Sequence, residues 1–411
     1  MLRPQKTISK HMKTKFFIVI LMILSASSFF NPLGAIDTKL SKTIYYGCVI
    51  YGLFFFRERA ESQKLKYPKV AYKMVIFGMI GAVIMAALYQ NQSLGISVMA
   101  ALPYLFGYLS FLVFMKSGLS EKQILWIISG MLCCSIFIYA VNYVTFPFKV
   151  FGNMDADSVD SSRGVLRIGV KYVELHMLAV FYSINQWLLH KEKKWFLAMV
   201  ICGLMIVLSV TRQVIAVTAM LSGLFLLNRL HLYQKIIFII LVTMFTMYVL
   251  PEIPIYKALV EHTQVQAERN ENEDDIRIRA ARYYMDEYQT NNMTRIFGNG
   301  IPSIGNSTWG NQFEQDTRHE RYYSSDIGWI GYYWHFGLIS VLGVLFLLLN
   351  SAIKKKTFNH EYLTYQCYAI IILSLLSAQI LIYYQVINLM MVLYLIYGTR
   401  RKEKILNPMK I

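Results

Sequence analysis

The sequence predicts an all-α polytopic membrane protein of about 12 transmembrane helices, with one large loop between helices 9 and 10. Of its 411 residues, 56% are hydrophobic and 16% are charged, and the mean hydropathy is +0.41. Soluble domains are closer to about 45–50% apolar and about 25% charged. The apolar residues also come in blocks close to the roughly 20 residues that cross a bilayer. Basic residues lie mainly in the short segments between blocks.

The predicted membrane helices follow one another along the chain with short connections, except before the tenth. A basic segment precedes the first block without a small-residue cleavage site, so we expect a retained anchor rather than a signal peptide. The apolar segments are 16–31, 43–56, 70–89, 95–115, 124–146, 168–189, 195–209, 213–227, 236–251, 326–350, 362–379 and 382–398.

Charge sets the expected orientation. The segments on one side hold 25 Lys and Arg, whereas the short connections on the other side hold 6. Because short cytoplasmic loops carry the excess of Lys and Arg, we expect both termini to be cytoplasmic. The basic segments are 1–15, 57–69, 116–123, 190–194, 228–235, 354–356 and 399–411. The predicted organisation is helices 1–9 over 1–251, a large outer loop over 252–325, and helices 10–12 with a basic tail over 326–411.

The outer loop is too polar to cross a membrane. Its 74 residues contain 8 Lys and Arg against 12 Asp and Glu. The stretch 268–288 has helical periodicity, and a glycine-rich turn region follows at 297–311. The apolar-aromatic face of the predicted helix contains Ile276, Ala280, Tyr283, Tyr284 and Tyr288.

Several classes of function are excluded or unsupported. The net charge of +17 is spread over short loops rather than gathered on one domain, so it does not indicate nucleic-acid binding. The five cysteines lie in apolar segments, which predicts no disulfide framework. No metal or nucleotide motif occurs, so we expect no metal and no cofactor.

Arginine is the candidate chemical group of the outer side, because its planar fork holds phosphate groups bidentately. Ordinary salt bridges with loop carboxylates are the alternative. Arg212 stands apart because it lies in a hairpin of two or three residues between tightly joined helices, where a charge at the membrane boundary is costly. The arginines considered as candidates are Arg163, Arg167, Arg212, Arg277, Arg279, Arg282, Arg295, Arg318 and Arg321.

Ionisable residues also fall within predicted helices. Lys171, Glu174 and His176 lie near the start of the sixth, where Lys171 and Glu174 share a helix face and could pair. Ionisable groups within a membrane mark functional sites or an ion path. A transporter is therefore an alternative function for this chain. His335, among aromatic residues, is expected to be a hydrogen-bonded histidine rather than a ligand.

A polar cluster precedes the tenth helix. The segment 318–328 contains His319, Glu320 and Asp326, any of which could act as a base toward a sugar hydroxyl. The alternative is a loop held by its own polar groups.

Four stretches and their layout resemble the O-antigen polymerase and O-antigen ligase superfamily of bacterial membrane proteins. TRQVIAV (211–217) resembles that family's Ser/Thr-Arg hairpin, and RGVLRIGVKYVELHMLAV (163–180) is similar to its Arg-Gly segment. RIFGNGIP (295–302) resembles its helix leading into a glycine turn. SDIGWIGYYWHFGLIS (325–340) resembles its glycine-spaced helix start. The layout covers nearly the whole chain, and the motifs cover about a quarter of it.

The resemblance implies a multi-pass protein of the bacterial inner membrane whose large loop is periplasmic. It implies transfer of a glycan from undecaprenyl diphosphate to a sugar hydroxyl of a lipid-linked repeat unit, with membrane lipids and a chain-length regulator as expected partners. Arg212, Arg279 and Arg167 would stabilise the departing diphosphate, with Arg163, Arg277 and Arg282 as neighbours. Asp326 or His319 would act on the acceptor hydroxyl. The rings of Trp309, Tyr322 and Tyr323 would bind sugars, although anchoring at the membrane interface explains these aromatic residues equally well.

One departure favours the polymerase branch over the ligase branch. Ligases typically have a histidine, a small polar residue and a leucine near this position, whereas this chain has His319, Glu320 and Arg321. The alternatives that stay open are a ligase and a flippase or other transporter. The absence of paired halves argues against a transporter.

Overall fold

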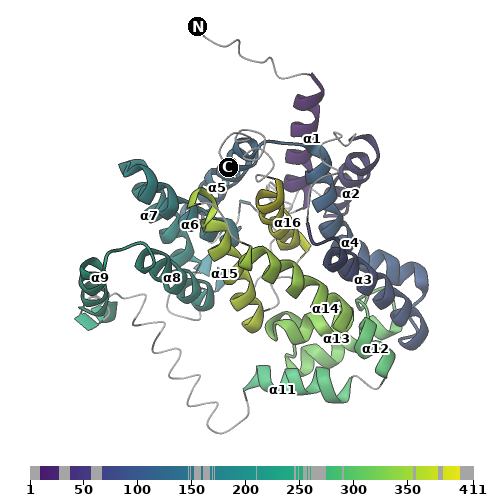
Figure 1. Cartoon of the computed structure of the whole chain (residues 1–411). Helices are drawn as coiled ribbons and strands as arrows, with labels where there is room; N and C mark the ends of the chain where they lie inside the picture. The colour runs from purple at the N-terminus through teal and green to yellow at the C-terminus, as the bar shows by residue number, and fades with distance from the viewer. Residues whose placement is uncertain are drawn as a thin grey trace.

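The structure is a computed structural model of the chain. The residues it describes are 10–26, 38–56, 67–146, 148, 150–151, 159–160, 167–168, 170, 172–209, 211–244, 247–248, 250–252, 257, 260, 275–288, 291–354, 358–377 and 383–398. Within these residues the fold is almost entirely helical (Figure 1).

A helix occupies most of each predicted apolar segment. Between α5 and α6, strands β1 (Val159–Asp160) and β2 (Arg167–Ile168) pair in antiparallel register. The helices that occupy the predicted apolar segments are α1 (Lys10–Ala26), α2 (Thr38–Phe55), α3 (Lys69–Tyr89), α4 (Leu94–Ser117), α5 (Glu121–Val144), α6 (Val173–His190), α7 (Lys193–Leu208), α8 (Arg212–Leu227), α9 (Leu232–Met244), α14 (Trp329–Ile353), α15 (Tyr362–Leu376) and α16 (Tyr383–Gly398).

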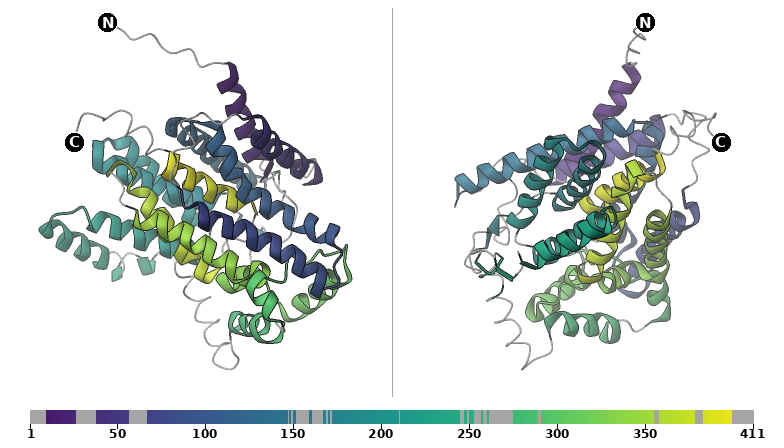
Figure 2. Two further views of the ribbon diagram at one scale, coloured as in Figure 1. Left: turned by 45° about the vertical axis from the view of Figure 1, so that its right-hand side comes forward. Right: turned by 60° about the vertical axis from the view of Figure 1, so that its left-hand side comes forward.

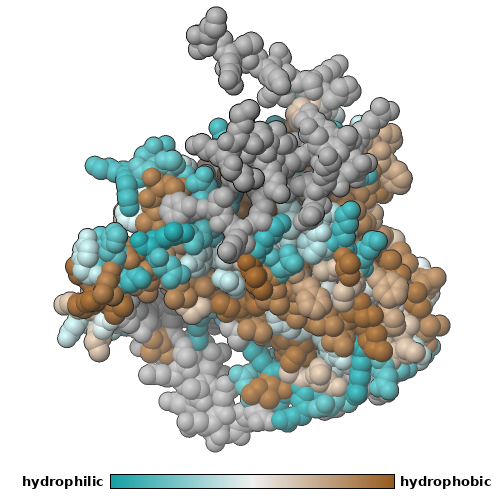
Figure 3. Space-filling model, viewed as in Figure 1, coloured by the Kyte–Doolittle hydropathy of each residue, from teal (hydrophilic) through white to brown (hydrophobic). Residues whose placement is uncertain are grey.

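Four of these helices are long and apolar enough to cross a membrane by length and composition. They are α3, α4, α5 and α14. Shorter apolar helices include α8, α15 and α16. The described part of the chain therefore has the character of a helical membrane protein. Figure 3 agrees with this: hydrophobic side chains dominate the face over α3 and α14, and hydrophilic ones gather along the lower edge, where α11 (Ile276–Arg282) lies.

Local sequence sets the sharp turn between α4 and α5. Gly118 follows α4 with φ of +62°, a left-handed conformation that glycine adopts without strain. Two residues later, Ser120 and Gln123 form a capping box at the start of α5. Both features are local, and the turn is also held from outside, because the Tyr394 hydroxyl donates to the Leu119 carbonyl at 2.6 Å.

Helices α3 and α14 form the closest helix pair of the fold and lie side by side (Figure 2). Small residues allow this approach: a Cβ added at Gly78 would lie 2.8 Å from Ser340 Cβ, and one added at Gly343 would lie 2.8 Å from the Ala71 carbonyl. Small residues at such interfaces bring helix backbones together in membranes. A hydrogen bond joins the two helices, since Ser340 Oγ donates to the Val75 carbonyl of α3 at 3.4 Å, and the Tyr332 hydroxyl of α14 lies 3.0 Å from the same Oγ.

The structure corrects the prediction of one continuous helix over 326–350. Gly337 has φ of +72° and ψ of 175°, so α14 breaks there into two helical parts. Only glycine adopts that region readily. The break frees carbonyl groups of the preceding turn, and these must find partners elsewhere in an apolar setting.

The segment before α14 is a set of short helices at one end of the α3 and α14 pair (Figure 1). These are α11, the π-helical turn Tyr283–Glu287, α12 (Asn292–Phe297), α13 (Thr308–Glu320) and the turn Ser324–Asp326.

The predicted helix over 268–288 is confirmed from Ile276 onward, and the part before 275 lies outside the described residues. Ala280 and Tyr284 are buried as predicted, but Ile276 is exposed, so the buried face is narrower than predicted.

Candidate functional site

Two segments bind each other at the break in α14. One is the turn over 298–300 that follows α12, here called the glycine turn, and the other is the stretch 334–337 of α14. The backbone N–H of Asn299 donates to the Trp334 carbonyl at 2.8 Å, and that of Gly300 donates to the His335 carbonyl at 3.0 Å. These are the carbonyls that the break at Gly337 leaves without their usual helical donors. A Cβ at Gly298 would overlap the His335 carbonyl, and one at Gly337 would overlap the Ile296 carbonyl. Both glycines are therefore required by close backbone approach.

The side chain of His335 forms two further hydrogen bonds at the same junction. Its Nδ1 lies 2.9 Å from the Gly300 carbonyl, and its Nε2 lies 3.1 Å from Ser324 Oγ. The expectation of a hydrogen-bonded histidine is confirmed. Because the Gly300 carbonyl can only accept, Nδ1 carries the proton, and Nε2 accepts from Ser324 when the ring is neutral. The ring thus links the glycine turn to the segment that precedes α14.

Two glutamines that follow α3 fix the other side of the glycine turn. Gln90 Nε2 donates to Asn299 Oδ1 at 2.9 Å. Gln92 is buried, donates to the Ile301 carbonyl at 3.0 Å and accepts from Ser307 Oγ at 2.8 Å. These bonds connect residues more than 200 positions apart in the sequence, and they hold the glycine turn against the end of α3.

A cluster of aromatic rings around Trp334, formed by Tyr284, Tyr288, Trp309 and Phe313, adjoins the glycine turn. Trp334 is fully buried and stacks on Phe313 with ring centroids 5.1 Å apart. Tyr284 and Tyr288 contact the same indole at 5.0 and 5.4 Å. Burial raises the pKa of both phenols, so each stays neutral.

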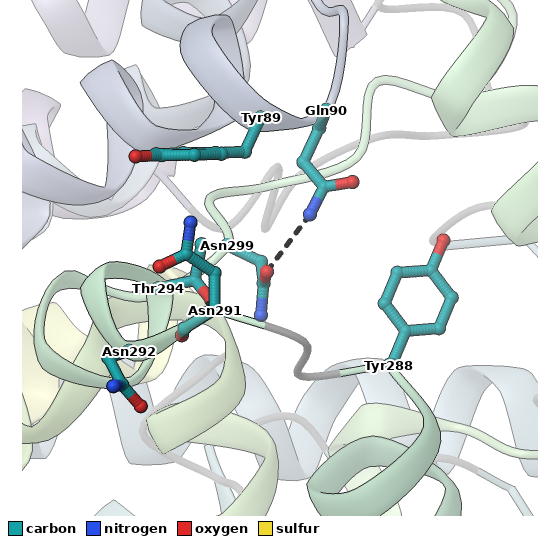
Figure 4. A pocket seen from close by; sticks show the side chains of 7 residues that line it. All are labelled: Tyr89, Gln90, Tyr288, Asn291, Asn292, Thr294 and Asn299. Atoms are coloured by element: carbon teal, nitrogen blue, oxygen red, sulfur yellow. Dashed lines mark hydrogen bonds between the residues drawn. The ribbon is translucent and has the colours of Figure 1, made fainter.

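A cavity of about 470 Å³ opens between the end of α3, the aromatic cluster and α12 (Figure 4). Ligand pockets commonly have volumes of about 300–1,000 Å³. No charged side chain belongs to the described lining, which consists of amides, a hydroxyl and aromatic rings. The lining residues are Tyr89, Gln90, Tyr288, Asn291, Asn292, Thr294 and Asn299.

The chemistry of this lining suits a ligand rich in hydroxyl groups. Each amide side chain offers both donors and an acceptor, and a hydroxyl group needs both. Asn291 is already engaged, because its Oδ1 accepts from Met293 N at 2.8 Å and starts α12. Asn292 is exposed at the edge of the cavity, so its amide is accessible to a ligand.

The two arginines ranked first from the sequence occupy different parts of the fold. Arg212 is the first residue of α8, which packs against α6 and α15. Arg279 is in α11, whose continuation packs against α14. Both side chains are half-buried, and the Nε atom of each is hidden from solvent. Neither lines the cavity described above.

The other predicted arginines divide into two groups. Arg277 and Arg282 are exposed on α11. Arg163 lies outside the described residues, and only the backbone of Arg167, in β2, is described.

The predicted base candidates lie on the surface near the start of α14. His319 is exposed at the end of α13, with Nδ1 3.1 Å from Glu320 Oε1. Asp326 is exposed, and its backbone N–H donates to the Tyr323 carbonyl at 3.0 Å. Neither His319 nor Asp326 lines the cavity.

The predicted sugar-stacking rings have unequal roles. Trp309 is 7% exposed, and its Nε1 donates to the Tyr288 hydroxyl at 3.0 Å, so it belongs to the aromatic cluster. Tyr322 is half-buried against Tyr283, with ring centroids 5.3 Å apart. Tyr323 is 50% exposed and keeps an open ring face. Tyr89, which sequence inspection passed over, contributes its ring to the cavity instead.

Sequence inspection missed the amides of the cavity. Gln90 sits in a short polar connection between two apolar segments, and Asn291, Asn292 and Asn299 look like ordinary loop residues. The one available signal was the unusual density of amides in the stretches YQNQ and TNNM.

No group of three or more His, Cys, Asp or Glu that could hold a metal occurs among the described residues. The chain matches no protein-family model, and no curated protein matches it.

Proposed function

We propose that this chain is a membrane glycosyltransferase that polymerises undecaprenyl-diphosphate-linked oligosaccharide repeats on the outer face of a bacterial inner membrane. The single observation that supports it most is the neutral cavity between α3 and α12. Its amides and rings fit an uncharged saccharide, whereas a cavity for a free anion would be expected to carry arginine or lysine.

The proposal includes the membrane arrangement expected from the sequence. Twelve helices would cross the bilayer, both termini would face the cytoplasm, and the segment 252–325 would lie on the periplasmic side. The four long apolar helices support a membrane location. The excess of basic residues on one side of the chain supports the orientation.

The reaction would use no nucleotide and no metal. A hydroxyl oxygen of the acceptor sugar attacks the anomeric carbon of the donor, and the bond from that carbon to the diphosphate oxygen breaks. The hydroxyl proton passes to a base, for which Asp326 and His319 are the candidates. Arg212, Arg279 and Arg167 are the candidates for stabilising the charge on the departing diphosphate, and Arg163, Arg277 and Arg282 are further candidates.

The site residues would have separate tasks. The cavity around Asn292 would hold a sugar unit away from the reacting bond, and Tyr322 and Tyr323 would contact the chain beyond it. Trp309 would act through the aromatic cluster that carries Tyr288. Partners would be membrane lipids and a chain-length regulator, with no nucleic acid.

Deletion and restoration of the gene, followed by electrophoresis of envelope glycans, tests the proposal. We expect the long-chain ladder to disappear while a single repeat unit remains on its carrier. Polymer that accumulates on the lipid carrier without reaching its final acceptor would indicate a ligase instead. An unchanged glycan profile would overturn the proposal and favour a transporter of another compound.

A further inference from the structure

A second polar site lies away from the cavity, among the apolar helices α6, α15 and α16. Glu174 in the first turn of α6 is surrounded there by Gln366 of α15 and by Gln385 and Asn388 of α16. The four enclose a small cavity of about 30 Å³. That is room for a single water or ion, since one water needs at least about 10–15 Å³. The remaining lining consists of Leu175, Ile370, Leu389 and Val392.

Hydrogen bonds fix the direction in which both glutamines point. Gln366 Nε2 donates to the Glu174 backbone carbonyl at 3.3 Å, and Gln385 Nε2 donates to Glu174 Oε1 at 2.9 Å. Since a carbonyl and a carboxylate can only accept, the amide nitrogens must face Glu174. The two amide oxygens are thereby turned away from these bonds.

Those amide oxygens are buried without a hydrogen-bond partner among the described residues. The same holds for both amide atoms of Asn388, which is 3% exposed, while Gln366 is 1% exposed. A buried polar atom without a partner costs about 1–3 kcal/mol. Three amide groups with such unpartnered atoms line one cavity. This indicates that a bound ion or molecule supplies the missing partners.

The donor set defines the chemistry of the missing group. One carboxylate and three amides offer oxygen ligands, which hard cations prefer. The cavity lining contains one acid and no base among its described residues, and Lys171, which the sequence offered as a partner of Glu174, lies outside them. In apolar surroundings a site near neutrality is favoured, because an uncompensated charge is expensive. One carboxylate balances a monovalent cation, whereas a divalent cation would leave a net positive charge.

We propose that Glu174, Gln366, Gln385 and Asn388 form a binding site for an alkali cation that joins α6, α15 and α16. The cation compensates the Glu174 carboxylate and completes the amide oxygens, so it ties together three helices that otherwise meet across a polar gap. This site does not depend on the proposed glycosyltransferase activity, because it shares no residue with the cavity at the end of α3.

The test uses the purified full-length protein in detergent. Its thermal unfolding midpoint is measured in NaCl, in KCl and in choline chloride at constant ionic strength. We expect Na⁺ or K⁺ to raise the midpoint relative to choline in a saturable way. Equilibrium binding of ²²Na⁺ or ⁸⁶Rb⁺ should show about one site per chain.

Variants identify the site. Glu174→Gln removes the charge and keeps the shape, and Asn388→Ala removes one amide. Each should weaken cation binding at least tenfold. Glu192→Gln, an exposed carboxylate beside Lys194, is the control and should bind as the wild type does. Equal responses to alkali and choline ions, or unaltered cation binding in Asn388→Ala and Glu174→Gln, would overturn the proposal and leave the cluster a water-filled polar contact.

Discussion

His335 Nδ1 lies 2.9 Å from the Gly300 carbonyl oxygen, which joins two segments that are 35 positions apart in the sequence. Next to this bond, two backbone N–H groups of the glycine turn donate to the two carbonyls that the break in α14 leaves without helical donors. The walls of the neutral cavity rest on this junction, since Asn299 belongs to both. Changes at the junction should therefore affect stability and the cavity together.

His335→Ala should lower the free energy of unfolding by about 1–3 kcal/mol, because it removes two hydrogen bonds and leaves the buried Gly300 carbonyl with one donor fewer. The thermal unfolding midpoint of the purified protein measures the effect. His319→Ala is the matched control, because His319 is exposed and its imidazole lies beside the neighbouring Glu320 carboxylate. Equal midpoints for the two variants would contradict the role of His335.

Gly337→Ala should destabilise the protein by at least about 2 kcal/mol, because alanine is strained at this φ and ψ. Its Cβ would also overlap the Ile296 carbonyl. Gly130→Ala in α5 is the control, since nothing lies within 4 Å of a Cβ there. That change should be neutral or stabilise by about 0.5–1 kcal/mol. Thermal unfolding of both variants compares them directly, and a stable Gly337→Ala protein would contradict a required break in α14.

Arg212→Ala and Arg279→Ala should leave membrane insertion intact and abolish long glycan chains. Arg→Lys at either position should restore only part of the chain length, because lysine cannot hold a diphosphate bidentately. Glycan electrophoresis and immunoblotting of membranes provide the two measurements. Arg318→Ala is the control, since Arg318 is 74% exposed and pairs with Glu314 on the same helix. Normal chain lengths in both alanine variants would reject the assignment of these arginines.

Reporter fusions at positions 64 and 275 should lie on opposite sides of the membrane. The first position is in a basic segment expected in the cytoplasm, and the second is in the large loop expected on the outer side. Alkaline phosphatase activity reports the outer side, and fluorescence of a green fluorescent protein reports the cytoplasm. Two fusions with the same reporter pattern would overturn the predicted orientation.

Hydropathy predicted the helices well because each apolar block must form its backbone hydrogen bonds internally. The break at Gly337 could not be predicted, because glycine in WHFGLIS fits a continuous helix equally well. It becomes necessary only when the turn around Gly300 supplies donors from elsewhere. Local sequence carries no record of such a pairing.

The candidate site was predictable only in part, for a similar reason. The segments 295–302 and 325–340, two of the four stretches that carry the family resemblance, contact each other in the structure. The cavity, however, combines Gln90 with Asn299, which are 209 positions apart. Amides carry no charge pattern or spacing rule that would link such distant residues.

The most direct test of the glycosyltransferase proposal fills the neutral cavity. Asn292→Trp places a large ring in it, and Gln315→Trp places the same ring on the exposed side of α13 as the control. Each variant is expressed in the deletion strain at equal membrane levels, and envelope glycans are separated on a gel. We expect a single repeat unit with Asn292→Trp and a full ladder with Gln315→Trp. A full ladder from both variants would contradict the claim that this cavity holds the glycan.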